Sequence, residues 1–160
     1  MSTMRVTQYK TRLTNEGRAV LEKEKSVNYP DLDRFMNSPD KLYRLATDVL
    51  SMHEETEEYL YMVCLNNKLR LSSVFELSHG DVKSSVVGIR EMFQKALLAN
   101  AVCVIVMHNH PSGDPTPSRE DITITKKMKE AGLIIGVDVL DHLVIGHGGK
   151  YCSLKDKGYI

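Results

Sequence analysis

The sequence lacks the features of exported and membrane proteins. It has no tryptophan and three cysteines, none in a CxxC pair, which indicates reduced thiols rather than a disulfide framework. The longest unbroken apolar run, Ala101 to Met107, is far shorter than the roughly 18 residues of a membrane helix. The stretch from Met1 to Lys10 has no apolar segment of the kind found in signal peptides. We therefore expect a cytoplasmic protein that does not associate with membranes.

An excess of charge of either sign is also absent. Twenty-one lysines and arginines balance 21 aspartates and glutamates, so the formal net charge is zero. A neutral chain has no whole-molecule attraction to nucleic acids or anionic membranes, although a local patch is compatible with this balance. The charge therefore does not support DNA binding.

The length and the pattern of apolar residues predict one α/β domain with a short arm. At 160 residues, 42% of them hydrophobic, the chain can build a single core without disulfides. Residues 1–37 are the least patterned and are predicted to be an N-terminal arm, so the domain spans 38–160. Apolar spacing in that domain predicts three helices and at least four strands. The helices are expected at 39–51, 89–99 and 118–131, with Gly132 ending the last, and the strands at 59–65, 69–77, 101–107 and 137–145. The first two strands read as a hairpin, which predicts a mixed sheet.

The most informative segment begins directly after the apolar run, at His108-Asn109-His110-Pro111. Side chains two apart on an extended strand point the same way, so His108 and His110 are expected to present their imidazoles on one side. The proline-rich loop that follows turns the chain back, which brings Asp121, in the first turn of the next helix, near the same place. Two histidines and one carboxylate leave a tetrahedral position open, as in catalytic zinc sites.

Each of these residues also has a purely structural interpretation. Paired histidines are common on surfaces, and Ser118 followed by Asp121 matches a helix capping box. If Asp121 binds a metal, we expect capping to fall to Ser118 alone. His142 is a candidate for orienting a metal ligand, but within an apolar strand we predict that it is a packing residue. The convergence of strand, loop and helix start favours the metal site.

The same residues resemble a known family. His108-x-His110-Pro111 followed by Ser118-x-x-Asp121 is similar to the JAMM metal signature of JAB/MPN domains, and HNHPSGDPTPSREDI resembles the RadC branch. The resemblance covers about residues 39–160. It implies a three-layer α/β/α, cytidine-deaminase-like fold with a mixed central sheet. It also implies Zn²⁺ held by His108, His110 and Asp121, with Ser118 as a polar contact to the reacting carbonyl.

The signature further requires a glutamate before the first core strand. Glu58 takes that place by alignment, and Glu57 is the reserve candidate for the general base. The residue pattern alone does not choose Glu58 over Glu54, Glu55, Glu57 or Glu91, because an acidic run before a strand is usually a solvated surface.

The resemblance implies a zinc-dependent hydrolase of the metallopeptidase or isopeptidase type, acting on a protein or peptide. Two other functions stay open: a non-catalytic accessory of DNA repair or mobile elements, and a metal-dependent nuclease. RadC proteins usually begin with a helix-hairpin-helix segment, and residues 1–37 show no such pattern, which weakens the expectation of DNA contact. The substrate, the oligomeric state and turnover itself are left open by the sequence.

Overall fold

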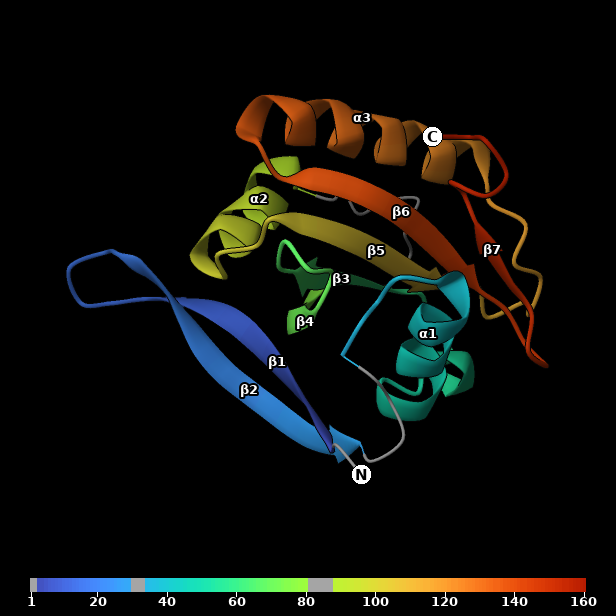
Figure 1. Ribbon diagram of the computed structural model, residues 1–160, viewed down its shortest axis with the longest axis horizontal. Coiled ribbons are helices and arrows are strands. Elements are labelled where there is room, and N and C mark those ends of the chain that lie inside the picture. The colour runs from blue at the N-terminus through green and yellow to red at the C-terminus, as the bar shows by residue number, and fades with distance from the viewer. Residues whose placement is uncertain (1–2, 30–33, 81–87) are drawn as a thin grey trace.

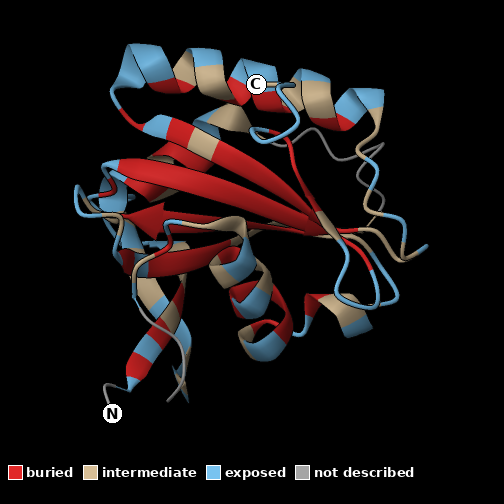
Figure 2. Ribbon diagram, turned by 45° about the vertical axis from the view of Figure 1, so that its right-hand side comes forward, coloured by how far each residue is buried: buried red, intermediate tan, exposed pale blue. Residues whose placement is uncertain are grey.

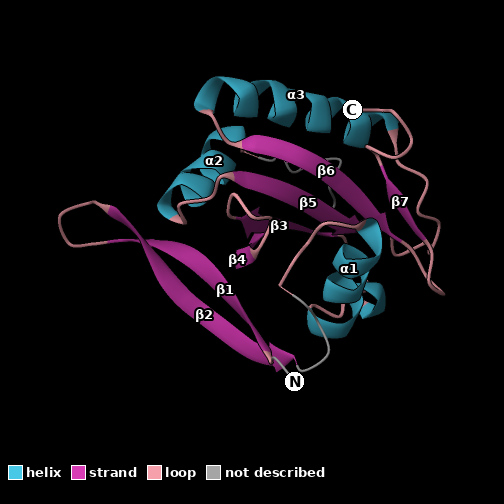
Figure 3. Ribbon diagram, in the orientation of Figure 1, coloured by secondary structure: helices cyan, strands magenta, loops and turns pink. Residues whose placement is uncertain are grey.

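In the computed structural model, described for residues 3–29, 34–80 and 88–160, the chain forms seven strands and three α-helices (Figure 3). The strands are β1 (Met4–Leu13), β2 (Ala19–Tyr29), β3 (Tyr59–Leu65), β4 (Leu71–His79), β5 (Cys103–Asn109), β6 (Asp138–Ile145) and β7 (Tyr151–Ser153). The helices are α1 (Pro39–Arg44), α2 (Ile89–Leu98) and α3 (Arg119–Ile135). A π-helical turn, η1 (Leu45–Val49), and a 3-10 turn, η2 (Met52–Glu54), follow α1. None of the helices in these ranges is both long and apolar enough to cross a bilayer.

All seven strands belong to one sheet, in the order β2-β1-β4-β3-β5-β6-β7. β1 runs parallel to β4 and β5 runs parallel to β6, whereas the other neighbouring pairs are antiparallel. Helices α2 and α3 cover one face of the sheet, and α1 with its following turns covers the other (Figures 1 and 2). This arrangement confirms the predicted three-layer α/β/α class with a mixed sheet.

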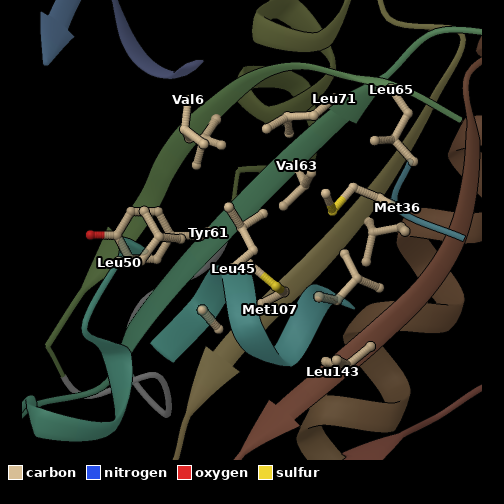
Figure 4. Packing of buried hydrophobic residues seen from close by; sticks show 14 of the residues in the cluster. Val6, Met36, Leu45, Leu50, Tyr61, Val63, Leu65, Leu71, Met107 and Leu143 are labelled. Carbon is tan, nitrogen blue, oxygen red and sulfur yellow. The ribbon is translucent and has the colours of Figure 1, made fainter. Parts of the chain in front are cut away.

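The central strands are buried on both faces, and alternate side chains feed two separate cores. In β3, Tyr61, Val63 and Leu65 pack toward α1 and η1, as Figure 4 shows, whereas Met62 and Cys64 pack toward α2 and α3. This alternation follows from the pleat of a strand. All seven residues of β5 are buried, which confirms the prediction of a central strand there. The three cysteines are buried and unpaired, as expected of reduced thiols.

The N-terminal arm contains regular structure that the sequence pattern did not indicate. β1 and β2 form an antiparallel hairpin that joins the sheet through β4, and in Figure 1 it projects from the rest of the molecule. Its inward positions in β1 are Met4, Val6 and Gln8, so the expected alternation is interrupted by a polar residue. β2 is mostly exposed, which removes the apolar pattern on which strand prediction depends. Residues 1–2 and 30–33 of the arm lie outside the described residues.

Helix α3 is longer than predicted. It continues past Gly132 and ends at Gly136, which adopts the left-handed conformation with φ 85°. Gly132 is needed for close packing instead, because a Cβ atom there would lie 2.4 Å from the Val137 carbonyl oxygen. The prediction that Gly132 ends the helix was therefore wrong. A helix-terminating glycine and a glycine that allows close contact look alike in a sequence.

Candidate metal centre

The end of β5 and the start of α3 bring three potential ligands together. His108 Nε2 lies 2.9 Å from His110 Nε2. The Asp121 carboxylate lies beside both rings: its Oδ1 is 3.4 Å from His108 Nε2, and its Oδ2 is 3.5 Å from His110 Nε2. One ligand atom from each residue lies within 4.8 Å of the others. His108 and Asp121 are buried and His110 is partly exposed, so the group opens to solvent on one side. The structure thus places the three predicted ligands in one cluster.

The hydrogen bond on the far side of His110 fixes which nitrogen faces the cluster. His110 Nδ1 lies 2.8 Å from the carbonyl oxygen of Asp114. A carbonyl oxygen only accepts hydrogen bonds, so Nδ1 must carry the proton and donate. In the neutral ring, Nε2 then presents a lone pair toward His108 and Asp121. The loop after β5 therefore sets His110 in the state that binds metal ions.

His108 is fixed in the same way by a buried chain of hydrogen bonds. Thr125 Oγ1 donates to the Asp121 carbonyl oxygen at 2.5 Å, so it accepts from His142 Nδ1, which lies 2.6 Å away. Neutral His142 consequently has a bare Nε2, and this atom accepts from His108 Nδ1 at 2.6 Å. His108 is left with a lone pair on Nε2, the atom that faces the cluster. Each ligand histidine is thus oriented through its remote nitrogen.

The role of His142 differs from the one predicted. It is a buried residue, but it contacts His108 directly and links that side chain to α3 through Thr125. Burial lowers the pKa of His142 well below its ordinary value, with a further contribution from the neighbouring His108, so the ring stays neutral and can accept. The prediction of a packing residue without contact to the site was therefore wrong. A polar residue within an otherwise apolar strand was the available signal in the sequence.

The donor set fits a metal ion. Two imidazole lone pairs 2.9 Å apart beside a carboxylate repel one another unless a proton or a metal cation lies between them. Ligands of tetrahedral zinc, bound at roughly 2.0–2.1 Å, lie about 3.3 Å apart, close to the separations in this cluster. Two nitrogen donors and one oxygen donor are also a ligand set of catalytic zinc sites. The chemistry of these three side chains therefore suits Zn²⁺.

The electrostatics of the cluster favour positive charge. The pKa of His110 is raised, mainly by its hydrogen bond with Asp121. Burial alone would raise the pKa of Asp121, but its interactions with the neighbouring imidazoles of His108 and His110 outweigh burial and hold that pKa well below its usual range. Asp121 is therefore a carboxylate at any ordinary pH, which is the form that binds cations.

Asp121 belongs to the cluster and to the helix cap at once. Asp121 N–H donates to Ser118 Oγ at 3.0 Å, and Ser118 N–H donates to Asp121 Oδ2 at 2.7 Å, which completes a capping box. The expectation that capping would fall to Ser118 alone once Asp121 binds a metal stays a prediction, because it concerns the metal-bound state. A carboxylate has two oxygens with several lone pairs, so one side chain can serve both purposes.

A cavity of about 450 Å³ opens beside the cluster. Its lining residues are Glu58, His110, Pro111, Ser112, Ser118, Glu120 and Asp121. Both further site candidates, Glu58 and Ser118, therefore face the same space as the ligands. Glu57 is exposed and pairs with His79 instead. Glu58 is partly buried, and its negative charge contributes to the raised pKa of His110 after the larger effect of Asp121.

The backbone on both sides of Glu58 is held by Asn109, which sequence reasoning did not single out. Asn109 Nδ2 donates to the Glu57 carbonyl oxygen at 2.9 Å, and Tyr59 N–H donates to Asn109 Oδ1 at 2.7 Å. The Glu58 carbonyl oxygen in turn accepts a hydrogen bond from Gly80 N–H at 2.9 Å. The contacts join residues 50 and 52 positions apart, so no local pattern could indicate them.

Comparisons with known proteins identify the family of the chain. The model of the RadC-like JAB domain matches residues 36–159. A UPF0758 protein of Methanosarcina barkeri is 42% identical over 134 residues, which are 81% of this chain and 58% of the relative. A UPF0758 protein of Clostridium novyi is 47% identical over 104 residues, 65% of this chain and 45% of the relative. The chain thus spans about half the length of these relatives. From the family match and the similarity to these relatives, we conclude that the chain belongs to the RadC-like JAB domain family.

Proposed function

We propose that the protein is a zinc-dependent hydrolase that cleaves amide or isopeptide bonds. The observation that carries this proposal is the orientation of His108 and His110, whose lone pairs are both aimed at the Asp121 carboxylate beside an open cavity. A structural zinc site would be closed by a fourth protein ligand, whereas this cluster, among the described residues, contains three. An accessible site with three protein ligands suits catalysis.

His108, His110 and Asp121 would hold the ion. When bound, zinc lowers the pKa of a water from 15.7 to about 7 and polarises a carbonyl group. Glu58 borders the same cavity and is assigned as general base: its carboxylate takes the proton of the attacking water and passes it to the leaving amine. Positioned proton transfer of this kind contributes typically 10²–10⁴-fold to the rate.

Ser118 is assigned to the developing oxyanion. Its oxygen accepts the Asp121 N–H of the helix cap, so its own hydroxyl hydrogen is available to donate into the cavity. A donor that is already oriented stabilises a negative charge without reorganisation during the reaction. Because the cap fixes Ser118 Oγ relative to Asp121, the donor and the metal ligand keep a constant separation.

The charges around the cavity support a peptide rather than a nucleic acid as substrate. Glu58, Glu120 and Asp121 contribute three carboxylates to the lining, and no lysine or arginine is among the described residues that form it. A phosphodiester backbone would be repelled by this lining, since DNA-binding sites depend on basic side chains. The neutral net charge of the chain points the same way.

The test compares Glu58→Gln with Glu57→Gln in the 160-residue chain loaded with one equivalent of zinc. Quenched-fluorescent peptides and an isopeptide-linked lysine peptide serve as substrates, with single- and double-stranded DNA in parallel. We expect Glu58→Gln to retain zinc and lose turnover about 10²–10⁴-fold, and Glu57→Gln, which changes an exposed neighbour, to retain both. Full activity in zinc-loaded Glu58→Gln would refute the assigned base. Cleavage of DNA alone would favour the nuclease, and cleavage of neither substrate the accessory role.

A further inference from the structure

Asn109 lies between the two candidate histidine ligands in the sequence, and its side chain contacts the main chain on both sides of the assigned base. It is the last residue of β5, between His108 and His110, and its side chain is 2% exposed. The pleat of the strand directs His108 toward the face of α3, whereas Asn109 contacts the segment that enters β3. The site described above does not use its amide group chemically.

The side-chain amide replaces the missing end of a β-ladder. Main-chain pairing between β3 and β5 ends at Leu60 and His108. Beyond this pair, the Asn109 side chain continues the contact by donating to the Glu57 carbonyl oxygen and accepting from Tyr59 N–H, at 2.9 and 2.7 Å. A side-chain amide provides one donor and one acceptor on the same planar group, which this arrangement requires. Aspartate lacks the donor, and alanine lacks both groups.

The residue between these two contacts is Glu58. Its own carbonyl oxygen is held by Gly80 N–H at 2.9 Å, so three hydrogen bonds fix the main chain around it. The Glu58 side chain is partly exposed and borders the cavity. Because its own side chain is not enclosed, its location depends on the fixed main chain from which it extends.

From this arrangement we infer that Asn109 is a positioning residue for Glu58: it sets the base relative to the ligands that flank Asn109 in the sequence. The inference rests on the proposed function, since it concerns the base of that reaction. The same short segment carries both candidate ligands and the Asn109 amide that holds the main chain around Glu58, so Asn109 contributes directly to the distance between base and ligands. A displacement of about 1 Å in such an arrangement can cost 10²-fold in rate.

The first experiment tests whether the two Asn109 hydrogen bonds hold the main chain around Glu58, and it requires neither an activity measurement nor a metal ion. Asn109→Ala removes both hydrogen bonds, and Asn109→Asp keeps the acceptor for Tyr59 N–H. Amide hydrogen exchange at Tyr59, measured by NMR in the full chain, is expected to become at least about tenfold faster in Asn109→Ala and to change less in Asn109→Asp. Unchanged exchange at Tyr59 in Asn109→Ala would show that Asn109 does not hold this main chain and would overturn the inference.

Asn66→Ala is the matched control. Asn66 follows the other end of β3, and its side chain also makes two hydrogen bonds with the main chain, both accepted, from Lys68 N–H at 2.9 Å and Arg70 N–H at 3.1 Å. This variant loses a comparable local support far along the strand from Glu58. We expect it to leave exchange at Tyr59 and all properties of the site unchanged. An equal effect of both variants would indicate general destabilisation and refute positioning.

The second experiment tests the connection to Glu58. With one zinc equivalent retained, Asn109→Ala is expected to lower kcat about 10–100-fold with little change in KM. In the Glu58→Gln background it should lower the residual rate no further, because the two changes remove one effect. An additive loss in the double variant, or loss of zinc in both Asn109 variants, would mean that Asn109 acts through the ligands and would overturn the inference.

A spectroscopic readout separates this inference from the proposed function. The cobalt-loaded protein is titrated with acid and base, and the pH midpoint of its visible absorption change is compared among wild type, Glu58→Gln, Asn109→Ala and the double variant. A shift in Glu58→Gln that is reproduced in Asn109→Ala and does not increase in the double variant supports positioning, even if no substrate is cleaved. A midpoint that moves in Glu58→Gln and stays in place in Asn109→Ala refutes it. If Glu58→Gln leaves the pH midpoint unchanged, Glu58 is not coupled to the ion. Both the inference and the assignment of Glu58 as the base are then wrong.

Discussion

The β1–β2 hairpin and the β5–α3 segment belong to one sheet but are held in different ways. β1 pairs with β2 along its whole length, from Met4 opposite Tyr29 to Leu13 opposite Ala19, and meets β4 in register at Gln8 alone. β5 is paired on both sides and covered on both faces. We therefore expect the exposed part of the hairpin to tolerate substitution better than β5, where a change is transmitted to the strands on both sides. The candidate metal ligands lie in the second region, at the end of β5 and the start of α3.

The largest effect is expected from Asp121→Asn, which separates the ligand from the cap. The amide oxygen can still accept from Ser118 N–H, so α3 should keep its first turn, but the anionic ligand is lost. Zinc affinity, measured by calorimetric titration, should fall by more than the ~10–100-fold typical of changes behind the ligands. Asp114→Asn, at an exposed loop position that contacts Thr116, is the control and should bind zinc like wild type. A zinc affinity equal to that of wild type in Asp121→Asn would contradict the assignment of Asp121 as a metal ligand.

A pair of methionines tests whether the two regions are independent. Met4 in the hairpin and Met107 in β5 are 1% and 0% exposed and pack in the same core. Truncation to alanine should lower the free energy of unfolding by about 2–5 kcal/mol in each case, as measured in urea. Met107→Ala should also weaken zinc binding, because Met107 precedes His108, and Met4→Ala should not. Equal weakening in both would show that the hairpin is coupled to the site.

A smaller effect on the same site is expected from His142→Phe. The change preserves most of the buried volume but leaves His108 Nδ1 and Thr125 Oγ1 without their partner. Zinc affinity should fall by about 10–100-fold, as for other residues that orient a metal ligand. His147→Phe replaces an exposed histidine and is the control. Unaltered affinity in His142→Phe would show that His108 is oriented by packing alone.

The smallest effect concerns the contact that joins the hairpin to η1. Tyr29 Oη donates to Asp48 Oδ2 at 2.7 Å. Burial would raise the pKa of Asp48, but the hydrogen bonds from Tyr29 and Thr47 outweigh it and lower that pKa below its ordinary value. A lowered pKa stabilises the fold above the unfolded value of about 3.9 and loses this contribution as the pH falls below it.

Tyr29→Phe removes this donor. Its denaturation midpoint, measured on metal-free protein, should lie slightly below that of wild type near neutral pH, and the difference should shrink through the acid range. A difference that is the same at all pH values would mean that the contact does not depend on the Asp48 charge. Zinc binding should be unaffected, because neither residue lines the cavity beside the cluster.

The sequence predicted those parts of the site that local spacing controls. His108 and His110 are two apart on a strand, and Ser118 and Asp121 are three apart at a helix start, so strand and helix geometry suffices to group them. The contacts of His142 depend instead on the alignment of β5 with β6, which places Val106 beside His142. That register is a tertiary property, and no spacing within either strand determines it.

The same reasoning explains what was missed elsewhere in the fold. The apolar strands β3 and β5 are recognisable because both faces are buried, whereas the mostly polar β2 resembles a loop in composition. Gly132 was assigned to a helix end because its packing against Val137 is visible only in three dimensions. The proposed base is an intermediate case, since an acidic run precedes β3 and its members differ in the direction they face.

Asp121 belongs both to the helix cap and to the candidate metal cluster, and this affects how readily an ion can bind. Asp121 Oδ2 is occupied by Ser118 N–H, whereas Oδ1 faces His108. An incoming cation can therefore be met by one oxygen while the other keeps the first turn of the helix intact. Little conformational entropy is lost on loading, because the chain has already adopted the required shape. Much of the cost of ordering these ligands is thus met by folding rather than by capture of the ion.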